Sequence, residues 1–98
     1  MLLTKPIRKN IEQKLVNYYT APHLLSVGWI YVIQKITMNL GDDIKKEYIV
    51  YVYKYGYSNE YCSKKIPYSK SSLKRIKKEV LYDIMAFAMQ KGIIKIKL

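Results

Sequence analysis

Three kinds of residue are scarce in this chain of 98 residues: cysteine, histidine and the acidic residues. The one cysteine, Cys62, cannot form an internal disulfide, and together with the one histidine, His23, it supplies too few ligands for a tetrahedral zinc site. Asp and Glu number only 7, and His23 has no evident catalytic partner. These shortages predict a protein that is not an enzyme and that uses no metal and no other cofactor.

The chain also lacks a long hydrophobic run. Its longest apolar stretch, residues 24–33, is interrupted by Ser26 and Gly28 and is too short to span a bilayer. We therefore expect no membrane segment. The lone Cys62 and the absence of a signal-peptide pattern predict a reducing cytoplasm, and the length predicts one domain over residues 1–98.

Positive charge is abundant and unevenly placed. Lys and Arg number 18 against 7 Asp and Glu, a net charge of +11, which favours a polyanionic partner, with nucleic acid as the leading candidate. Seven bases and no acid lie within residues 62–78, so the partner should meet the second half of the chain. The alternative is that lysine is common in proteins from AT-rich genomes, which the content of Ile, Lys, Tyr and Asn also fits.

Apolar spacing predicts a mainly helical, all-α domain. In residues 6–19 the apolar residues Ile7, Ile11, Leu15 and Tyr18 share one helical face. Residues 23–39 are so densely apolar that their length favours a buried helix while their β-branched content favours a strand. We expect residues 1–41 to form an N-terminal helical part that packs or binds a partner.

Residues 42–90 are expected to form the DNA-binding part. Asp42 or Asp43 can cap a helix over residues 43–55, which ends at Gly56. The apolar face of this helix is expected to comprise the following residues: Ile44, Tyr48, Tyr51, Val52 and Tyr55.

A second pair of caps predicts a helix-turn-helix over about residues 59–78. Ser58 can cap a helix over residues 59–66, which must stop before Pro67, and Ser69 can cap a longer helix that reaches about Gln90, with Gly92 just beyond. The residues expected to face inward between the two helices are Cys62, Ser63, Ile66, Tyr68, Leu73 and Ile76. The residues left on the outer face of the second helix are Ser69, Lys70, Ser71, Lys74, Arg75 and Lys78.

This pattern resembles a known group of modules. The segments at residues 55–60 and 66–79, with an aromatic-Gly-Tyr-Ser lead, a short helix, Tyr-Ser and a Lys/Arg-rich helix, look like the helix-turn-helix of sigma factor region 4 and of the small phage late-transcription regulators of the RinA and ArpU type. The resemblance covers about residues 48–85, and it departs from the usual pattern at Pro67, where a Gly is common. It implies sequence-specific promoter binding to double-stranded DNA and transcriptional regulation, encoded by a phage or another mobile element.

The chemistry of the side chains suggests a role for each. Lys70, Lys74 and Arg75 are expected to contact base edges or nearby phosphates, with Arg75 suited to a bidentate contact with guanine. Ser69 and Ser71 are expected to hydrogen-bond phosphate or bases. The residues expected to anchor phosphates without reading sequence are Lys64, Lys65, Lys77 and Lys78.

Other interpretations stay open at this point. Taken alone, the basic helix is equally consistent with a solvated surface, and the cap, turn and core pattern favours DNA binding. The apolar N-terminal half suggests an adaptor that binds RNA polymerase or another regulator, or a homodimer with two recognition helices. Eleven tyrosines are compatible with base stacking on single strands, but their helical spacing favours the core. Residues 93–98 alternate apolar residues and Lys, as in a short edge strand or a tail that pairs with another chain.

Overall fold

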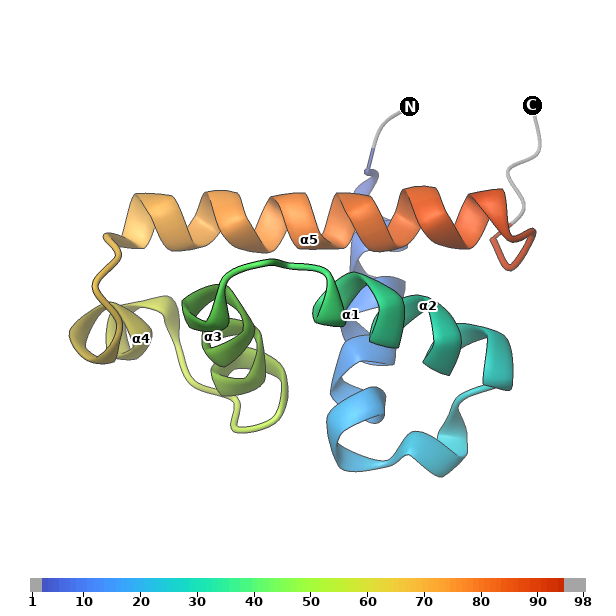
Figure 1. Ribbon diagram of the computed structural model, residues 1–98, viewed down its shortest axis with the longest axis horizontal. Helices are drawn as coiled ribbons and strands as arrows, with labels where there is room; N and C mark the ends of the chain where they lie inside the picture. Colours follow the sequence, from blue (N-terminus) through green and yellow to red (C-terminus); the bar gives the residue numbers. More distant parts are fainter. Residues whose placement is uncertain (1–2, 95–98) are drawn as a thin grey trace.

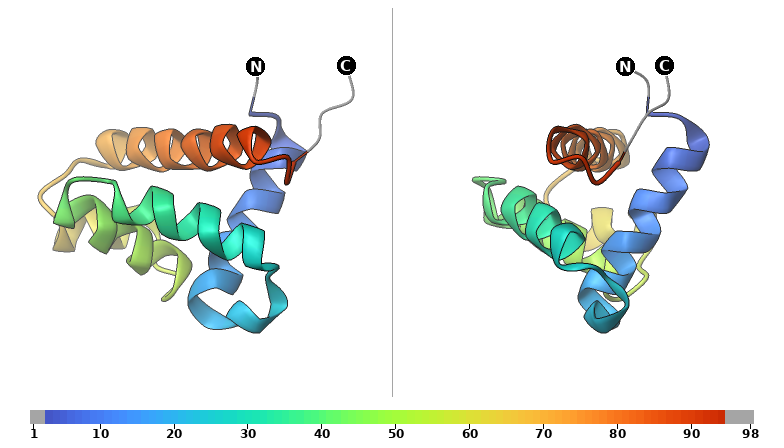
Figure 2. Two further views of the ribbon diagram at one scale, coloured as in Figure 1. Left: turned by 45° about the vertical axis from the view of Figure 1, so that its right-hand side comes forward. Right: turned by 90° about the vertical axis from the view of Figure 1, so that its right-hand side faces the viewer.

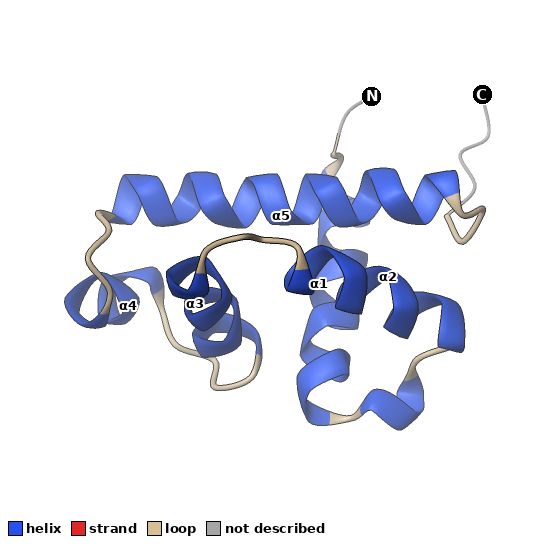
Figure 3. Cartoon of the chain, viewed as in Figure 1, coloured by secondary structure: helices blue, strands red, loops and turns tan. Residues whose placement is uncertain are grey.

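The computed structural model describes residues 3–94, and this range is helical, with no strand (Figure 3). An all-α domain is therefore confirmed. In chain order the elements are α1 (Lys5–Thr20), a short 3-10 helix η1 (Pro22–Leu24), α2 (Val27–Met38), α3 (Asp43–Tyr53), α4 (Asn59–Lys65) and α5 (Lys70–Gln90).

The longest helix, α5, organises the molecule. It lies along the longest axis of the molecule, and α2, α3 and α4 lie on one side of it (Figure 1). α4 packs under its N-terminal end, α2 packs under its C-terminal half, and α1 crosses near the middle and also contacts α2 and α3. Seen along α5, the helices α1, α2 and α5 form the three sides of a wedge (Figure 2). Residues of all three meet inside it.

One hydrophobic core joins the two parts of the chain. Its buried side chains come from every α-helix, so the described residues 3–41 and residues 42–90 are held together as one packed unit. The predicted inner positions Ile11 and Leu15 of α1 are fully buried. The largest fully buried side chains elsewhere are Tyr48, Ile33, Ile49, Leu73, Leu81, Ile84 and Met85.

The second element differs from the prediction at its start. We expected one element over residues 23–39, and the helix assignment is correct, but α2 begins only at Val27. Pro22 opens the separate turn η1, and the hydroxyl of Ser26 then accepts a hydrogen bond from the Trp29 amide at 3.3 Å. A serine that caps a helix in this way fixes the start of the helix, because it satisfies an amide that lacks a helical partner.

α3 is capped as predicted, and its buried face overlaps the predicted one without matching it. Asp42 accepts a hydrogen bond from the Ile44 amide at 2.8 Å, and Gly56 takes a φ of +72°, as expected for a residue that follows a helix. The helix ends at Tyr53, and the fully enclosed side chains are Tyr48, Ile49 and Tyr53. Tyr55 lies beyond the helix and is 52% exposed, so its predicted place in the core is wrong.

The end of α5 also follows the predicted signals. Gly92 has a φ of +74°, and the Ile93 amide donates to the carbonyl of Ala88 at 2.9 Å, which closes the last turn. Ile93 and Ile94 are half-buried against the core and form no strand. The rest of the strand or tail considered for residues 93–98 lies outside the described residues.

Candidate nucleic-acid interface

α4, a short turn and α5 form the expected helix-turn-helix. The Ser58 hydroxyl accepts from the Tyr61 amide at 3.2 Å, and the Ser69 hydroxyl accepts from the Ser72 amide at 3.2 Å, so both predicted caps are confirmed. Ile66 is extended, with a φ of −120°, as Pro67 requires of the residue before it. α4 is seen nearly end-on where α5 lies in the plane of the view, so the two helices cross steeply (Figure 1).

The contact between the two helices is apolar. Cys62 from α4, Ile66 just after it, and Leu73 and Ile76 from α5 are all buried, as their spacing predicted. Burial raises the pKa of the Cys62 thiol, so this side chain stays protonated and packs as a small hydrophobic group. Ser63 is partly buried, and its hydroxyl donates to the carbonyl of Glu60 at 2.7 Å.

α3 holds the helix-turn-helix in place through two hydrogen bonds. The Tyr48 hydroxyl, which comes from the core, donates to the side chain of Asn59 at the start of α4, at 2.6 Å. The Tyr68 hydroxyl in the turn donates to Asp42 at 3.0 Å, next to the cap of α3. The hydrogen bond from the Ile44 amide, and after it the bond from Tyr68, lower the pKa of Asp42. The bond to Asp42 raises the pKa of Tyr68. The short α4 is thus fixed at both of its ends.

The N-terminal half of α5 presents a polar and basic face. Ser71, Lys74, Arg75 and Lys78 recur at positions i, i+3, i+4 and i+7 and are all exposed. Ser69 and Lys70, at the start of the helix, are exposed beside them. The structure therefore brings the six predicted outer residues together on one end of the molecule.

One acid borders this face without neutralising it. Glu79 lies 4.0 Å from the Arg75 guanidinium, and the two side chains are 59% and 72% exposed. Ion pairs of this length between exposed groups contribute little, because water screens them and both side chains lose freedom. Arg75 therefore remains available to a partner.

Lys64 and Lys65 lie at the end of α4, on the other side of the turn from Lys70, and both are exposed. Their position in the last turn of a helix is also what the helix dipole favours in any protein. Lys65 additionally places its ammonium 5.7 Å from the ring centre of Tyr61. These two lysines extend the basic surface past the turn.

Lys77 is placed differently from the other predicted phosphate anchors. It is half-buried, and desolvation lowers the pKa of its ammonium, while the carboxylate of Glu12 opposes that shift. Cys62 and Arg8 are also close enough to act on it. Lys77 thus faces α1 and α4, so we leave it out of the interface.

The tyrosines divide between the core and the surface. Tyr48 and Tyr53 are buried, and Tyr18, Tyr19, Tyr51 and Tyr68 are partly buried against the core, so the expectation from helical spacing holds for six of the eleven. Tyr51 and three exposed tyrosines gather where α3 ends and α4 begins, and we call this group the tyrosine cluster: Tyr51, Tyr55, Tyr57 and Tyr61. Its one sequence signal is the Tyr-Gly-Tyr triplet at residues 55–57, since a turn at Gly56 brings its neighbours together.

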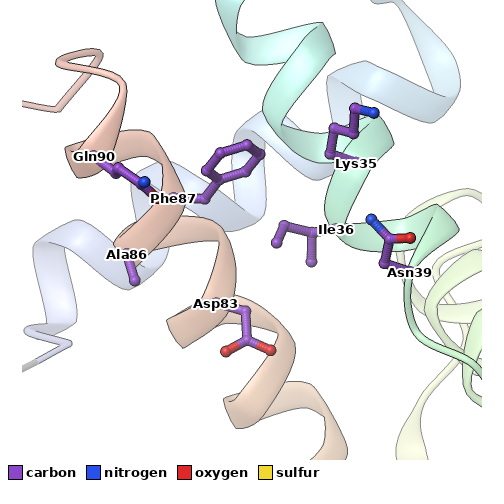
Figure 4. A pocket seen from close by; sticks show the side chains of 7 residues that line it. All are labelled: Lys35, Ile36, Asn39, Asp83, Ala86, Phe87 and Gln90. Carbon is purple, nitrogen blue, oxygen red and sulfur yellow. The ribbon is translucent and has the colours of Figure 1, made fainter.

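A second surface lies on the N-terminal half of the chain. Between α2 and the end of α5 is an open groove in which Ile36 and Phe87 extend toward one another, with Lys35, Asn39, Asp83 and Gln90 around them (Figure 4). The apolar residues exposed on or next to α2 are Leu24 (62%), Val27 (84%), Tyr31 (43%) and Met38 (63%).

Comparisons with protein-family models, with curated proteins and with solved structures found no match to this chain. Within residues 3–94, no three His, Cys, Asp or Glu side chains are grouped so that they could hold a metal ion. None of the helices in that range is long and apolar enough to cross a membrane.

Proposed function

We propose that the protein is a sequence-specific DNA-binding transcriptional regulator of a phage or mobile element, which inserts the start of α5 into the major groove of double-stranded DNA. The observation that carries the proposal is the exposed basic face of Ser71, Lys74, Arg75 and Lys78 at the start of the second helix of a helix-turn-helix, which only Glu79 borders among the residues of α5. A helix fits the major groove, and the N-terminal residues of the second helix are the ones that reach base edges in such modules.

The geometry supports a division of roles. Lys70, Lys74 and Arg75 reach base edges or the phosphates beside them, and the planar guanidinium of Arg75 suits the two acceptors of a guanine. Ser69 and Ser71 donate to phosphates or bases. Lys64, Lys65 and Lys78 bind phosphates on either side of the groove, which sets the orientation of the protein and the salt dependence of binding.

The supporting contacts matter to this mechanism as much as the exposed ones. α5 reads a groove only if its angle to the DNA backbone is fixed, and α4 with its two lysines sets that angle. The bonds of Tyr48 to Asn59 and of Tyr68 to Asp42 hold α4 and the turn on α3. The interface is thereby built before DNA arrives, which lowers the entropic cost of binding.

The decisive experiment is selection from a pool of random duplexes at two salt concentrations, with sequencing of the retained DNA. A sequence-reading regulator enriches a short motif that persists at the higher salt, because base contacts do not depend on counterion release. Retention that disappears with salt and carries no motif would contradict sequence-specific binding.

A double charge reversal tests the assigned face. For Lys74→Glu together with Arg75→Glu we expect affinity for the selected duplex to fall roughly 1,000-fold, since two direct contacts are lost and repulsion is added. Both side chains are exposed, so the helical circular dichroism spectrum and the unfolding temperature should stay close to those of the unchanged protein. Retained affinity in the folded variant would exclude this face.

A protein-binding role is the second candidate, and the exposed apolar side chains of α2 favour it. Val27 and Tyr31, with the groove beside Phe87, offer a surface for RNA polymerase, another regulator or a second copy of the chain. Val27→Asp with Tyr31→Asp should abolish such an association and leave duplex selection intact. Sedimentation of the free protein distinguishes a homodimer from a monomer that binds a different partner.

A further inference from the structure

The tyrosine cluster is assembled from three segments of the chain. Tyr51 comes from α3, Tyr55 and Tyr57 come from the connection, and Tyr61 comes from α4. The rings of Tyr55 and Tyr57 are stacked, with centres 5.6 Å apart and planes 21° apart, and the rings of Tyr57 and Tyr61 are 4.5 Å apart. Tyr51 contacts both Tyr55 and Tyr57. The cluster is therefore a continuous aromatic surface.

This surface is open to solvent. Tyr55, Tyr57 and Tyr61 are 52%, 38% and 41% exposed. Isolated exposed apolar side chains are common in proteins. Rings that gather from three segments and stay exposed form a contiguous patch, and such patches are typical of binding sites. The hydroxyl of Tyr51 donates to Glu47, which raises the pKa of Tyr51 to about 12 and keeps this ring neutral and oriented.

Lysines border the rings. The ammonium of Lys54 lies 5.4 Å from the ring centre of Tyr55, and that of Lys65 lies 5.7 Å from the ring centre of Tyr61. The acids on these helices are Asp43, which lies 4.0 Å from Lys46, Glu47, which accepts from Tyr51, and Glu60 in the first turn of α4, where the helix dipole stabilises its charge. The patch thus combines aromatic faces with the two ammonium groups of Lys54 and Lys65.

We propose that the tyrosine cluster binds unpaired nucleotides of a single-stranded nucleic acid, with bases stacked on its rings and phosphates held by Lys54 and Lys65. Rings beside a positively charged track are the composition that binds single strands without reading their sequence, because every base has a face that stacks. Stacking of a base is stronger than the contact of an exposed ammonium with a ring, so a base can displace either lysine toward a phosphate.

The same chemistry argues against an apolar peptide as the occupant. Each ring ends in a hydroxyl, two ammonium groups stand over the rings, and the whole protein carries a charge of +11. A polyanion with flat aromatic groups complements all three features, whereas an apolar peptide would have to desolvate the hydroxyls and the charges. The proposed duplex-binding face on α5 is a different surface, although Lys65 borders both, and this inference does not rest on it.

The test is fluorescence anisotropy with labelled oligothymidylate and oligouridylate strands of about 12 nucleotides, at low salt, with a labelled duplex of the same length for comparison. Tyr55→Ala with Tyr57→Ala should weaken binding to the single strands by about tenfold or more, because stacking is lost at two rings. Binding to the duplex should change by less than about twofold, since paired bases do not expose their faces. The two labelled strands show whether DNA or RNA is preferred.

Two control variants make the result decisive. Tyr55→Phe with Tyr57→Phe keeps the rings and should retain single-strand binding. Tyr82→Ala removes a tyrosine of similar exposure, 45%, that stands alone on α5, and should have no effect. Failure of the unchanged protein to bind either strand, an unaffected alanine double variant, or an equal loss in Tyr82→Ala would each overturn the proposal. Thermal unfolding confirms that each variant is folded.

Discussion

The two halves of α5 differ in almost every property although they belong to one uninterrupted helix. Residues 70–78 carry five basic residues and no acid, and only Leu73 and Ile76 are buried. Residues 79–90 carry two acids and no base, and five of their side chains are buried: Val80, Leu81, Ile84, Met85 and Ala88. The first half lies over α4 and α3, and the second half crosses α1 and α2 (Figure 1).

This difference shows how a small protein presents a rigid binding surface. A helix of 21 residues is about 30 Å long, so its two halves lie against different helices. The buried second half anchors the helix, and the unbroken backbone hydrogen bonds carry that rigidity into the exposed first half. Substitutions in the second half should therefore affect stability, and substitutions in the first half should affect binding.

The largest effect is expected in the anchoring half. Ile84 is fully buried, and Ile84→Ala should lower the free energy of unfolding by about 2 to 5 kcal/mol, because it loses burial and leaves a cavity. The exposed neighbour Ala86 provides the control, since Ala86→Ser should change stability by less than about 0.5 kcal/mol. Urea unfolding measures both. An Ile84→Ala variant as stable as the parent would mean that this half does not anchor α5.

Two adjacent lysines sharpen the comparison on the binding side. Lys78 is exposed on the proposed interface, whereas Lys77 is half-buried toward α1. Lys78→Met should weaken duplex binding several-fold and reduce the slope of log affinity against log salt by about 1. Lys77→Met should leave both quantities nearly unchanged. Salt titrations of the two variants measure the contrast, and equal losses would show that Lys77 reaches DNA.

A pair of serines tests how much the helix cap contributes to the stability of the first half. The Ser69 hydroxyl caps α5, so Ser69→Ala should cost about 1 kcal/mol of stability. Ser71 is exposed and caps nothing, so Ser71→Ala should change stability by less than about 0.5 kcal/mol. Chemical unfolding measures the free energy of unfolding of both variants. Equal stability of the two variants would show that the cap contributes nothing to α5.

The smallest effect concerns the bond that ties the turn to α3. The pKa of Asp42 is held below its ordinary value by the Ile44 amide and the Tyr68 hydroxyl. A carboxyl group whose pKa is lower in the folded state stabilises above its unfolded pKa of about 4, and that contribution is lost as the pH falls through the folded pKa. Asp42→Asn should therefore be more destabilising at pH 7 than at about pH 3. Thermal unfolding of the variant and the unchanged protein at both pH values measures this. Equal destabilisation at the two pH values would show that the charge of Asp42 does not contribute to stability.

Local signals in the sequence predicted the helix-turn-helix well. Ser58, Pro67 and Ser69 define two helix starts and one helix end through bonds and clashes that span only a few residues, and the structure has all three boundaries within one residue of the prediction. The exposed face of α5 followed from the same register, because Leu73 and Ile76 had to face α4. Short-range physics was sufficient there.

The errors arose where several packing arrangements share one sequence pattern. The dense apolar run of residues 23–39 hid the cap at Ser26, so the start of α2 was placed too early. In α3 tyrosines occur on more than one face, and periodicity does not say which face meets α1 and which meets water. Burial selected Tyr48, Ile49 and Tyr53, and it left Tyr55 outside with the tyrosine cluster.

The sequence by itself determined the helical class, the caps, the helix-turn-helix and the basic character of the first half of α5, because these depend on interactions between residues near one another in the chain. Only the tertiary structure decided that Lys77 turns toward α1, that Tyr68 bonds to Asp42, and that the tyrosine cluster stays exposed. Each of these depends on which helices meet. That choice is made by the summed burial of the whole core, which no short stretch of sequence contains.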